Sequence, residues 1–218
     1  MTALPDLGGQ ITTPPRGHLH VVDEPRDVDL PAAERAATEL LAALGLDVTS
    51  EGLRDTPRRI AASYAEMFSP PAFDLTTFPN DEGYDELVLA RSLPVISVCE
   101  HHLLPFMGVA HVAYLPGERI LGLSKLARVV ELFARRPQVQ ERLTQQVADW
   151  LADALSPRGV GVVIEAEHLC MTARGVRAGG TTTVTSALHG HLRDDAASRA
   201  EFFALVGGPR GLATGVAR

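Results

Sequence analysis

Apolar positions recur every three or four residues in one early part of the chain and mostly every second residue later on. From Asp29 onward, apolar residues at helical spacing predict a helix that ends at Gly45. A second helix begins at Thr56, with Pro57 in its first turn, and ends before the proline pair at 70–71. The pattern therefore predicts a helical pair over residues 29–71.

Beyond residue 85 the pattern changes to that of strands. Predicted strands cover Leu87–Val98, Gly108–Leu115, Val160–Cys170 and Thr181–Leu188. Two helices with apolar stripes lie between the second and third strands, separated by Pro137, and a short helix over Ala196–Val206 follows the last strand. Residues 72–85 are predicted to be a loop because of their Pro, Asn, Asp and Gly content. The order is a helical pair followed by ββααββ, which predicts an α+β fold.

Length and composition fit one compact domain over residues 29–206, with a helical extension at 29–71 and a core at 86–206. Residues 1–28 carry four prolines and no sustained apolar period, so a flexible arm is expected, and the Gly-rich residues 207–218 suggest a flexible tail. The net charge of −7 disfavours a broad nucleic-acid or membrane surface. With two cysteines, no signal-like segment and no membrane-spanning apolar run, we expect a cytoplasmic protein.

Chemistry concentrates in two segments that hold both cysteines and three of the eight histidines. These segments are Ser-Val-Cys-Glu-His-His-Leu-Leu-Pro-Phe at 97–106 and Glu-His-Leu-Cys-Met at 167–171. Zinc favours thiolate and imidazole ligands, and the C-x-x-H step lets Cys99 and His102 bind one ion. With Cys170 they make three ligands, the number common in catalytic zinc sites.

Two histidines in these segments have no metal role, and imidazole suits proton transfer near neutral pH. These are His101 and His168. In an extended strand, His168 and Cys170 face the same side, so both are expected to reach one site. The pattern predicts hydrolysis at a zinc site, whereas a single Cys or His taken alone is more often an ordinary core residue.

The chain has 19 arginines and a single lysine, Lys125. An ammonium group is a compact point charge that can bind phosphate, so the surviving lysine is a candidate ligand for a phosphate group.

The two segments, together with Gly122–Arg128, Arg136–Leu143 and Arg174–Val176, closely resemble GTP cyclohydrolase I over about residues 30–206. The resemblance implies the tunnelling fold, a four-stranded antiparallel sheet with two helices on one face. It further implies a homodecamer of two stacked pentamers with sites between chains. The implied reaction converts GTP to 7,8-dihydroneopterin triphosphate plus formate, the first step of pterin and tetrahydrofolate biosynthesis. It begins when water activated by zinc attacks C8 of the purine.

The resemblance also implies residue roles. It makes Cys99, His102 and Cys170 the ligands of one zinc ion per subunit, and His101 and His168 the acid and base groups. Glu141 would bind guanine, helped by Gln140 and by backbone groups near Leu121 and Leu123. The implied triphosphate contacts are Arg59, Ser124, Lys125, Arg128 and Arg174. The Gly-rich and Thr-rich segment 177–183 departs from the family pattern.

Other interpretations stay open at this stage. Arg128, Arg135 and Arg136 also fit a solvated helix face paired with Glu131, and Glu141 also fits an i,i+4 pair with Gln145. A structural zinc completed by His101 would make the chain a silent zinc-binding or nucleotide-binding module. Two further alternatives are an activity like that of the related nitrile reductases, and a variant of the cyclohydrolase reaction that stops at the ring-opened intermediate.

Overall fold

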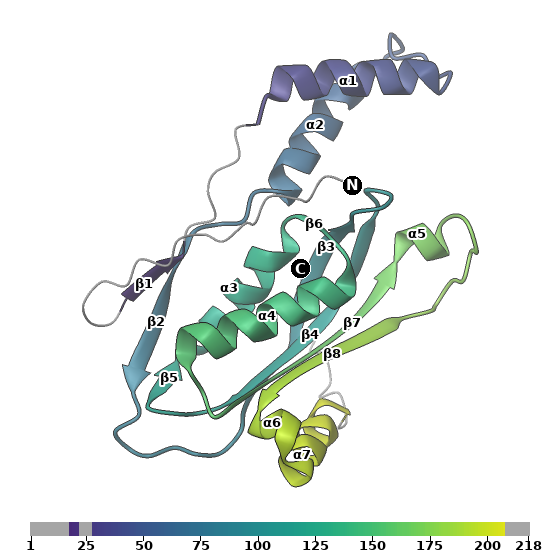
Figure 1. Ribbon diagram of the computed structural model, residues 1–218. Helices are drawn as coiled ribbons and strands as arrows, with labels where there is room; N and C mark the ends of the chain where they lie inside the picture. Colours follow the sequence, from purple (N-terminus) through teal and green to yellow (C-terminus); the bar gives the residue numbers. More distant parts are fainter. Residues whose placement is uncertain (1–17, 22–27, 208–218) are drawn as a thin grey trace, which may run out of the picture.

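The protein is described by a computed structural model over residues 18–21 and 28–207 (Figure 1). Its N-terminal part is a pair of helices, α1 (Leu30–Ala43) and α2 (Thr56–Met67). The Asp29 side chain accepts a hydrogen bond from a first-turn N–H of α1, and both helices carry a proline in the first turn. The predicted helical pair is therefore confirmed.

The body of the fold is a sheet of four long strands with one short strand at its edge. In spatial order the strands are β6 (Pro137–Gln138), β3 (Val88–Cys99), β4 (Pro105–Leu115), β7 (Gly159–His168) and β8 (Thr183–Gly190). The four long strands pair antiparallel, and β6 runs parallel to β3. The predicted α+β class and the ββααββ order are confirmed, with β6 as an addition.

Two helices, α3 (Leu123–Ala134) and α4 (Gln140–Leu155), cover one face of this sheet (Figure 1). Their apolar stripes meet the strand side chains of the same face and form the main core. Core side chains with no measurable exposure include Leu126, Val129, Leu143, Val147, Leu151, Val162 and Ile164. Burial of such side chains contributes about 1.5–3 kcal/mol each, so this layer is the main stabilising contact of the fold.

The opposite face of the sheet is covered at one end by α6 (His191–Asp194) and α7 (Ala196–Gly207). Leu192 and Phe202 pack there against Ala113 and Val163, which alternate along their strands with residues of the main core. The helix predicted over Ala196–Val206 is thus confirmed, with a preceding helical turn that was not predicted.

A second, smaller sheet corrects one prediction. Its central strand is β2 (Phe73–Pro79), paired with β1 (His18–Val21) and with β5 (Arg119–Leu121). The loop predicted over residues 72–85 is wrong in its first half, because alternating Phe73 and Leu75 are buried while most loop-forming residues follow later.

Four residues of the predicted arm form strand β1. The rest of the predicted arm, at 1–17 and 22–27, and the predicted tail at 208–218 lie outside the described residues. None of the helices in the described ranges is long and apolar enough to cross a membrane.

Candidate metal centre

The last residue of β3 and the turn that follows it carry two of the three candidate metal ligands. The Cys99 carbonyl accepts a hydrogen bond of 2.8 Å from the Leu103 N–H, and the Cys99 N–H donates one of 2.9 Å to the Leu104 carbonyl. Leu103 has a φ of +51°, a left-handed conformation that turns the chain into β4. Tyr64 of α2 donates its hydroxyl to the Leu103 carbonyl at 2.9 Å, so the helical extension also supports this turn.

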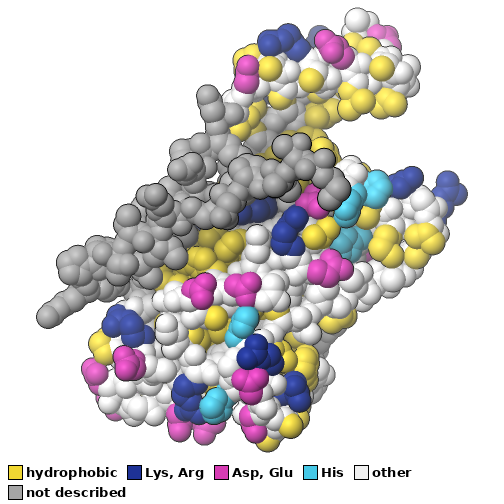
Figure 2. Space-filling view, viewed as in Figure 1, with side chains coloured by type: hydrophobic (Ala, Val, Ile, Leu, Met, Phe, Trp, Pro, Cys, Tyr) yellow, Lys and Arg dark blue, Asp and Glu magenta, His cyan; other side chains and the backbone are white. Residues whose placement is uncertain are grey.

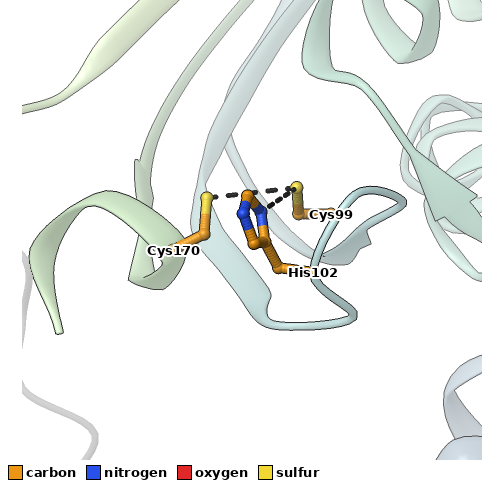
Figure 3. Close-up of side chains that lie close together, drawn as sticks. All are labelled: Cys99, His102 and Cys170. Atoms are coloured by element: carbon orange, nitrogen blue, oxygen red, sulfur yellow. Dashed lines mark hydrogen bonds between the residues drawn. The ribbon is translucent and has the colours of Figure 1, made fainter. Parts of the chain in front are cut away.

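The ligand atoms of Cys99, His102 and Cys170 all lie within 4.8 Å of one another (Figure 3). Cys99 Sγ lies 3.9 Å from Cys170 Sγ and 3.8 Å from His102 Nδ1. Two thiolates on one tetrahedral zinc, with Zn–S bonds of about 2.3 Å, stand roughly 3.8 Å apart. The donor set and its spacing therefore fit a zinc ion.

Cys170 reaches this site from α5 (Leu169–Thr172), a single helical turn closed by a backbone hydrogen bond of 3.0 Å. The prediction that His168 and Cys170 share a strand face is wrong, because β7 ends at His168. Burial raises the pKa of the Cys170 thiol, and the nearby Cys99 raises that pKa further. Zinc binding must displace the thiol proton of Cys170, since the thiolate is the form that binds zinc.

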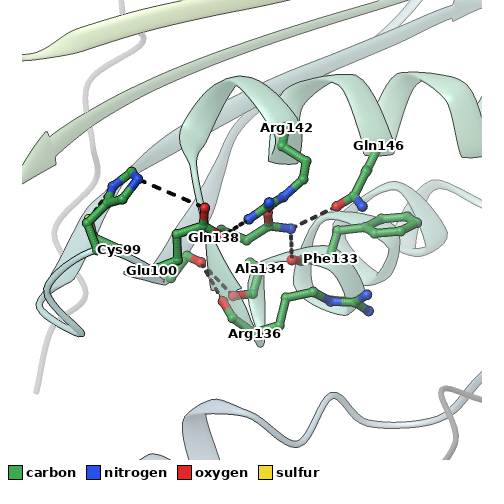
Figure 4. Close-up of polar contacts among 10 residues, drawn as sticks. Cys99, Glu100, Phe133, Ala134, Arg136, Gln138, Arg142 and Gln146 are labelled. Atoms are coloured by element: carbon green, nitrogen blue, oxygen red, sulfur yellow. Dashed lines mark hydrogen bonds and ion pairs between the residues drawn. The ribbon is translucent and has the colours of Figure 1, made fainter. Parts of the chain in front are cut away.

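His101 lies beside the ligands with its ring largely exposed. Its Nδ1 is 3.8 Å from Cys99 Sγ, and its Nε2 is 4.0 Å from the Glu100 carboxylate. Glu100 forms an ion pair with Arg142 of α4, whose Nε donates to Gln138 Oε1 at 2.9 Å (Figure 4). The Glu100 N–H also donates to the Gln138 carbonyl at 3.0 Å. The turn is thereby tied to β6 and to the first turns of α4.

His168 is half-buried at the end of β7. Its ring stacks on Phe106, with centroids 4.6 Å apart and planes 13° apart. Its Nε2 lies 2.7 Å from Gln140 Oε1. Burial lowers the pKa of His168, and the negative charge of Glu141 opposes this with a smaller upward effect. The ring is thus held in one orientation and favours the neutral form, which can accept a proton.

The two residues at the start of α4 differ in exposure. Glu141 is exposed in the first turn, open to a ligand from solvent. Gln140 is only 2% exposed, and its amide is hydrogen-bonded inside the fold. The alternative pairing of Glu141 with Gln145 is not observed. The Gln145 side-chain amide instead donates to the Asp149 carboxylate at 2.6 Å.

The predicted residues at the start of α3 lie far from the metal ligands of the same chain. Leu121 is buried just before the helix, while Leu123 and Ser124 are exposed and Lys125 is half-buried. The other end of the helix, at Ala134, lies beside β3, since its carbonyl accepts a 2.7 Å bond from a β3 serine (Figure 1). At 1.5 Å per residue, Lys125 stands about 14 Å along the helix from that end.

Two other predicted phosphate contacts lie elsewhere on the surface. Arg174 Nη1 is 3.4 Å from His102 Nε2, so its guanidinium borders the metal site. Arg59 is exposed on α2 and lies 3.7 Å from the Asp55 carboxylate. Figure 2 shows a group of histidine side chains with cationic and anionic side chains near it on the face in view.

The arginines around α3 fit the alternative interpretation in part. Arg128 and Arg135 both pair with Glu131, at 3.1 and 2.9 Å. Arg136 is instead buried, with an exposed fraction of 8%. Pairing with Glu131 occupies one side of the Arg128 guanidinium and leaves half of that side chain exposed.

Sequence reasoning missed several residues that support the site: Tyr64, Glu100, Phe106 and Arg142. Glu100 and Arg142 lie inside the motif segments that were singled out, between residues with assigned roles. That position was the available signal.

An α+β fold that brings two thiols and one imidazole together beyond the ends of its strands, with two more histidines next to these segments, defines a class of protein. The class is that of proteins with a three-ligand zinc site of the kind used for hydrolysis.

Comparison with known proteins narrows this class. The profile of the GTP cyclohydrolase I family matches residues 33–207. A GTP cyclohydrolase 1 of Mycobacterium ulcerans (strain Agy99) is 56% identical over 188 residues, covering 83% of this chain and 92% of the relative. One from Mycobacterium leprae (strain Br4923) is 52% identical over 209 residues, covering 94% and 98%. The chain belongs to the GTP cyclohydrolase I family.

Among solved structures, an archaeosine synthase QueF-Like in the apo form aligns with a TM-score of 0.38 and 20% identity. The alignment covers 48% of this chain and 93% of that one.

Proposed function

We propose that the residues around Cys99, His102 and Cys170 carry out the GTP cyclohydrolase I reaction, in which GTP becomes 7,8-dihydroneopterin triphosphate and formate is released. The observation that carries the proposal is the three-ligand cluster in a chain of this family, with His101 beside Cys99 and with His168 two positions before Cys170. Cys99, His102 and Cys170 would hold zinc. When bound, zinc supplies Lewis acidity that makes a water molecule nucleophilic near neutral pH.

The two histidines would move protons during ring opening and loss of formate. His168 is held by Phe106 and Gln140 and favours the neutral form, so it can accept a proton. His101 is more exposed, and its Nε2 lies 4.0 Å from the Glu100 carboxylate.

Substrate recognition would place the guanine on Glu141 and the phosphates on cationic side chains. The exposed carboxylate of Glu141, one position after Gln140, can accept two hydrogen bonds from the N–H edge of guanine. Arg174 borders the metal site and would meet the phosphate chain from one side. Binding both ends of GTP would hold C8 of the purine at the metal.

The remaining phosphate contacts support an assembly with shared sites. Ser124 and Lys125 lie at the end of α3 away from their own metal ligands. A second copy of the chain would supply them, as in the decamer of two stacked pentamers that the resemblance implies. The same proposal covers Arg59, Arg128 and the backbone near Leu121 and Leu123. It places the enzyme in the cytoplasm.

The test is to incubate the zinc-loaded protein with GTP, with and without a chelator, and to measure formate and, after oxidation, pterin fluorescence. We expect both products, and loss of both with the chelator. Formate without pterin would indicate a reaction that stops at the ring-opened intermediate. Neither product, from zinc-loaded protein, would refute the proposed activity and favour a silent binding module.

A matched pair of variants tests the ligand set. His102→Ala removes a ligand and is expected to lower zinc content and turnover together. His189→Ala is the control, because His189 pairs with Asp149 at 2.7 Å, on α4 and β8 outside the proposed site. Full zinc content in His102→Ala would contradict its role as a ligand.

A further inference from the structure

Gln140 is a buried polar residue whose contacts are all inside the protein. Its amide nitrogen lies 3.0 Å from the Ile164 carbonyl and 2.9 Å from the Thr183 carbonyl. The same nitrogen lies 3.1 Å from Thr185 Oγ1, and the amide oxygen lies 2.7 Å from His168 Nε2. Both ends of this amide are therefore engaged between α4, β7 and β8.

The two carbonyls fix which way the Gln140 amide points. A main-chain carbonyl only accepts hydrogen bonds, so the group facing Ile164 and Thr183 must be the NH₂. The opposite orientation would set the amide oxygen against two carbonyl oxygens at about 3 Å, in a site where no water can intervene at bonding distance. The amide oxygen must therefore face His168.

The hydroxyl pair next to the amide reinforces this direction. Thr144 Oγ1 lies 2.8 Å from the Gln140 carbonyl, which can only accept, so Thr144 donates to it. Thr144 Oγ1 must then accept from Thr185 Oγ1, 2.6 Å away. The Gln140 NH₂ has two hydrogens for its three acceptor neighbours, so its longest contact, 3.1 Å to Thr185 Oγ1, shares a hydrogen with one of the carbonyls. Each bond in the network thus has one possible direction.

We propose that Gln140 is a positioning residue that fixes the proton of the neutral His168 ring on Nε2 and leaves Nδ1 as its lone-pair atom. With Gln140 Oε1 as the partner, Nε2 must carry the hydrogen, since the alternative places two lone pairs 2.7 Å apart. The stack on Phe106 prevents free rotation of the ring, so Nδ1 is the atom left for proton exchange.

This assignment rests on the proposed function and deepens it. A ring whose Nε2–H stays on Gln140 can take a proton at Nδ1 and return it without any change in the buried network. The oxygen of Gln140 accepts from Nε2 in both states, so the cycle requires no reorganisation there. Gln140 therefore acts through His168. Of these two neighbouring residues, only Glu141 would contact the guanine.

The kinetic test is Gln140→Met in the zinc-loaded, full-length chain, because methionine keeps the shape and removes the acceptor. A positioning role predicts that kcat for GTP falls about 10- to 100-fold, part of what an acid–base group contributes, while KM changes less than about threefold. A guanine-binding role predicts the reverse, a raised KM with kcat retained, and that result would overturn the proposal.

Thr144→Val is the matched control. It is nearly isosteric, lies one helical turn after Gln140 and is equally buried. It removes two hydrogen bonds of the same network, to the Gln140 carbonyl and to Thr185, without touching His168. We expect its kcat to stay within about threefold of the wild type, since the main-chain carbonyls still orient the Gln140 amide. An equal loss of kcat in both variants would attribute the effect to local destabilisation and overturn the positioning role.

A second measurement uses the wild-type protein, so it does not depend on whether a Gln140 variant folds. Nitrogen-15 NMR of histidine-labelled, zinc-loaded wild type is expected to show the neutral His168 ring with its proton on Nε2, the signal being assigned by its loss in His168→Gln. A proton on Nδ1 would overturn the proposal. Wild-type protein that does not turn over GTP would refute the proposed function, while this spectrum would still decide where the proton lies.

Discussion

Replacing Arg142 by methionine would test how the fold supports its metal turn. The change removes the ion pair with Glu100 and the hydrogen bond to Gln138, but it keeps much of the apolar stem. The two charged side chains are 36% and 31% exposed, between the extremes of surface and buried pairs. Exposed pairs contribute up to about 1 kcal/mol and buried charged hydrogen bonds about 1.5–3, so we expect a loss of about 1–2 kcal/mol in stability.

The same change should also weaken zinc binding, because Glu100 lies directly after the ligand Cys99. Removing a partner that orients a metal ligand typically lowers metal affinity 10- to 100-fold. The bond from the Glu100 N–H to the Gln138 carbonyl remains, so we expect the lower end, about tenfold, or about 1.4 kcal/mol. Competition against a chromophoric chelator measures the affinity, and thermal unfolding measures the stability.

Arg193→Met is the matched control, since Arg193 forms an exposed ion pair with Asp194 at 2.8 Å, on α6 and away from the metal turn. It should leave both zinc affinity and stability nearly unchanged. If Arg142→Met lowered stability but kept wild-type zinc affinity, the ion pair would support the fold alone, and our account of the turn would be wrong.

Two further outcomes follow from the packing. Removing zinc in air should join Cys99 and Cys170 in a disulfide, because sulfur atoms 3.9 Å apart need to approach by only about 1.9 Å; two free thiols after prolonged oxidation would contradict a shared ion. Gly108→Ala should cost about 3 kcal/mol, since the added Cβ would lie 1.9 Å from the Glu165 carbonyl oxygen. Gly52→Ala, where the added Cβ meets nothing within 4 Å, is the control, and equal melting temperatures for the two variants would refute this strand contact.

Much of the fold could be predicted because its elements have clear periodic patterns. The stripe of α3, with Leu126 and Val129 at helical spacing, is buried as expected. The three ligands could be predicted for a different reason: both cysteines lie within three positions of a histidine, and few other residues bind zinc. In both cases a local pattern sufficed.

Prediction failed where a contact between distant segments decides the outcome. The strand period suggested that β7 continues to Cys170, but the chain turns after His168 into a helical turn that the alternation of residue types does not reveal. Likewise, sequence treats Gln140 and Glu141 as neighbours with one task. Successive helix residues point about 100° apart, so one side chain enters the core and the other faces solvent.

The segment around the start of α4 therefore serves both sides of the proposed reaction. Gln138, with Arg142, holds the turn that carries His101, whereas Gln140 holds His168. Because both sets of bonds leave one short stretch of chain, a small shift of the α4 N-terminus would move both histidines relative to the metal ligands. Proton transfer depends steeply on such distances. Substitutions that move this end of α4 should therefore lower kcat while leaving zinc content high, unlike substitutions of the ligands themselves.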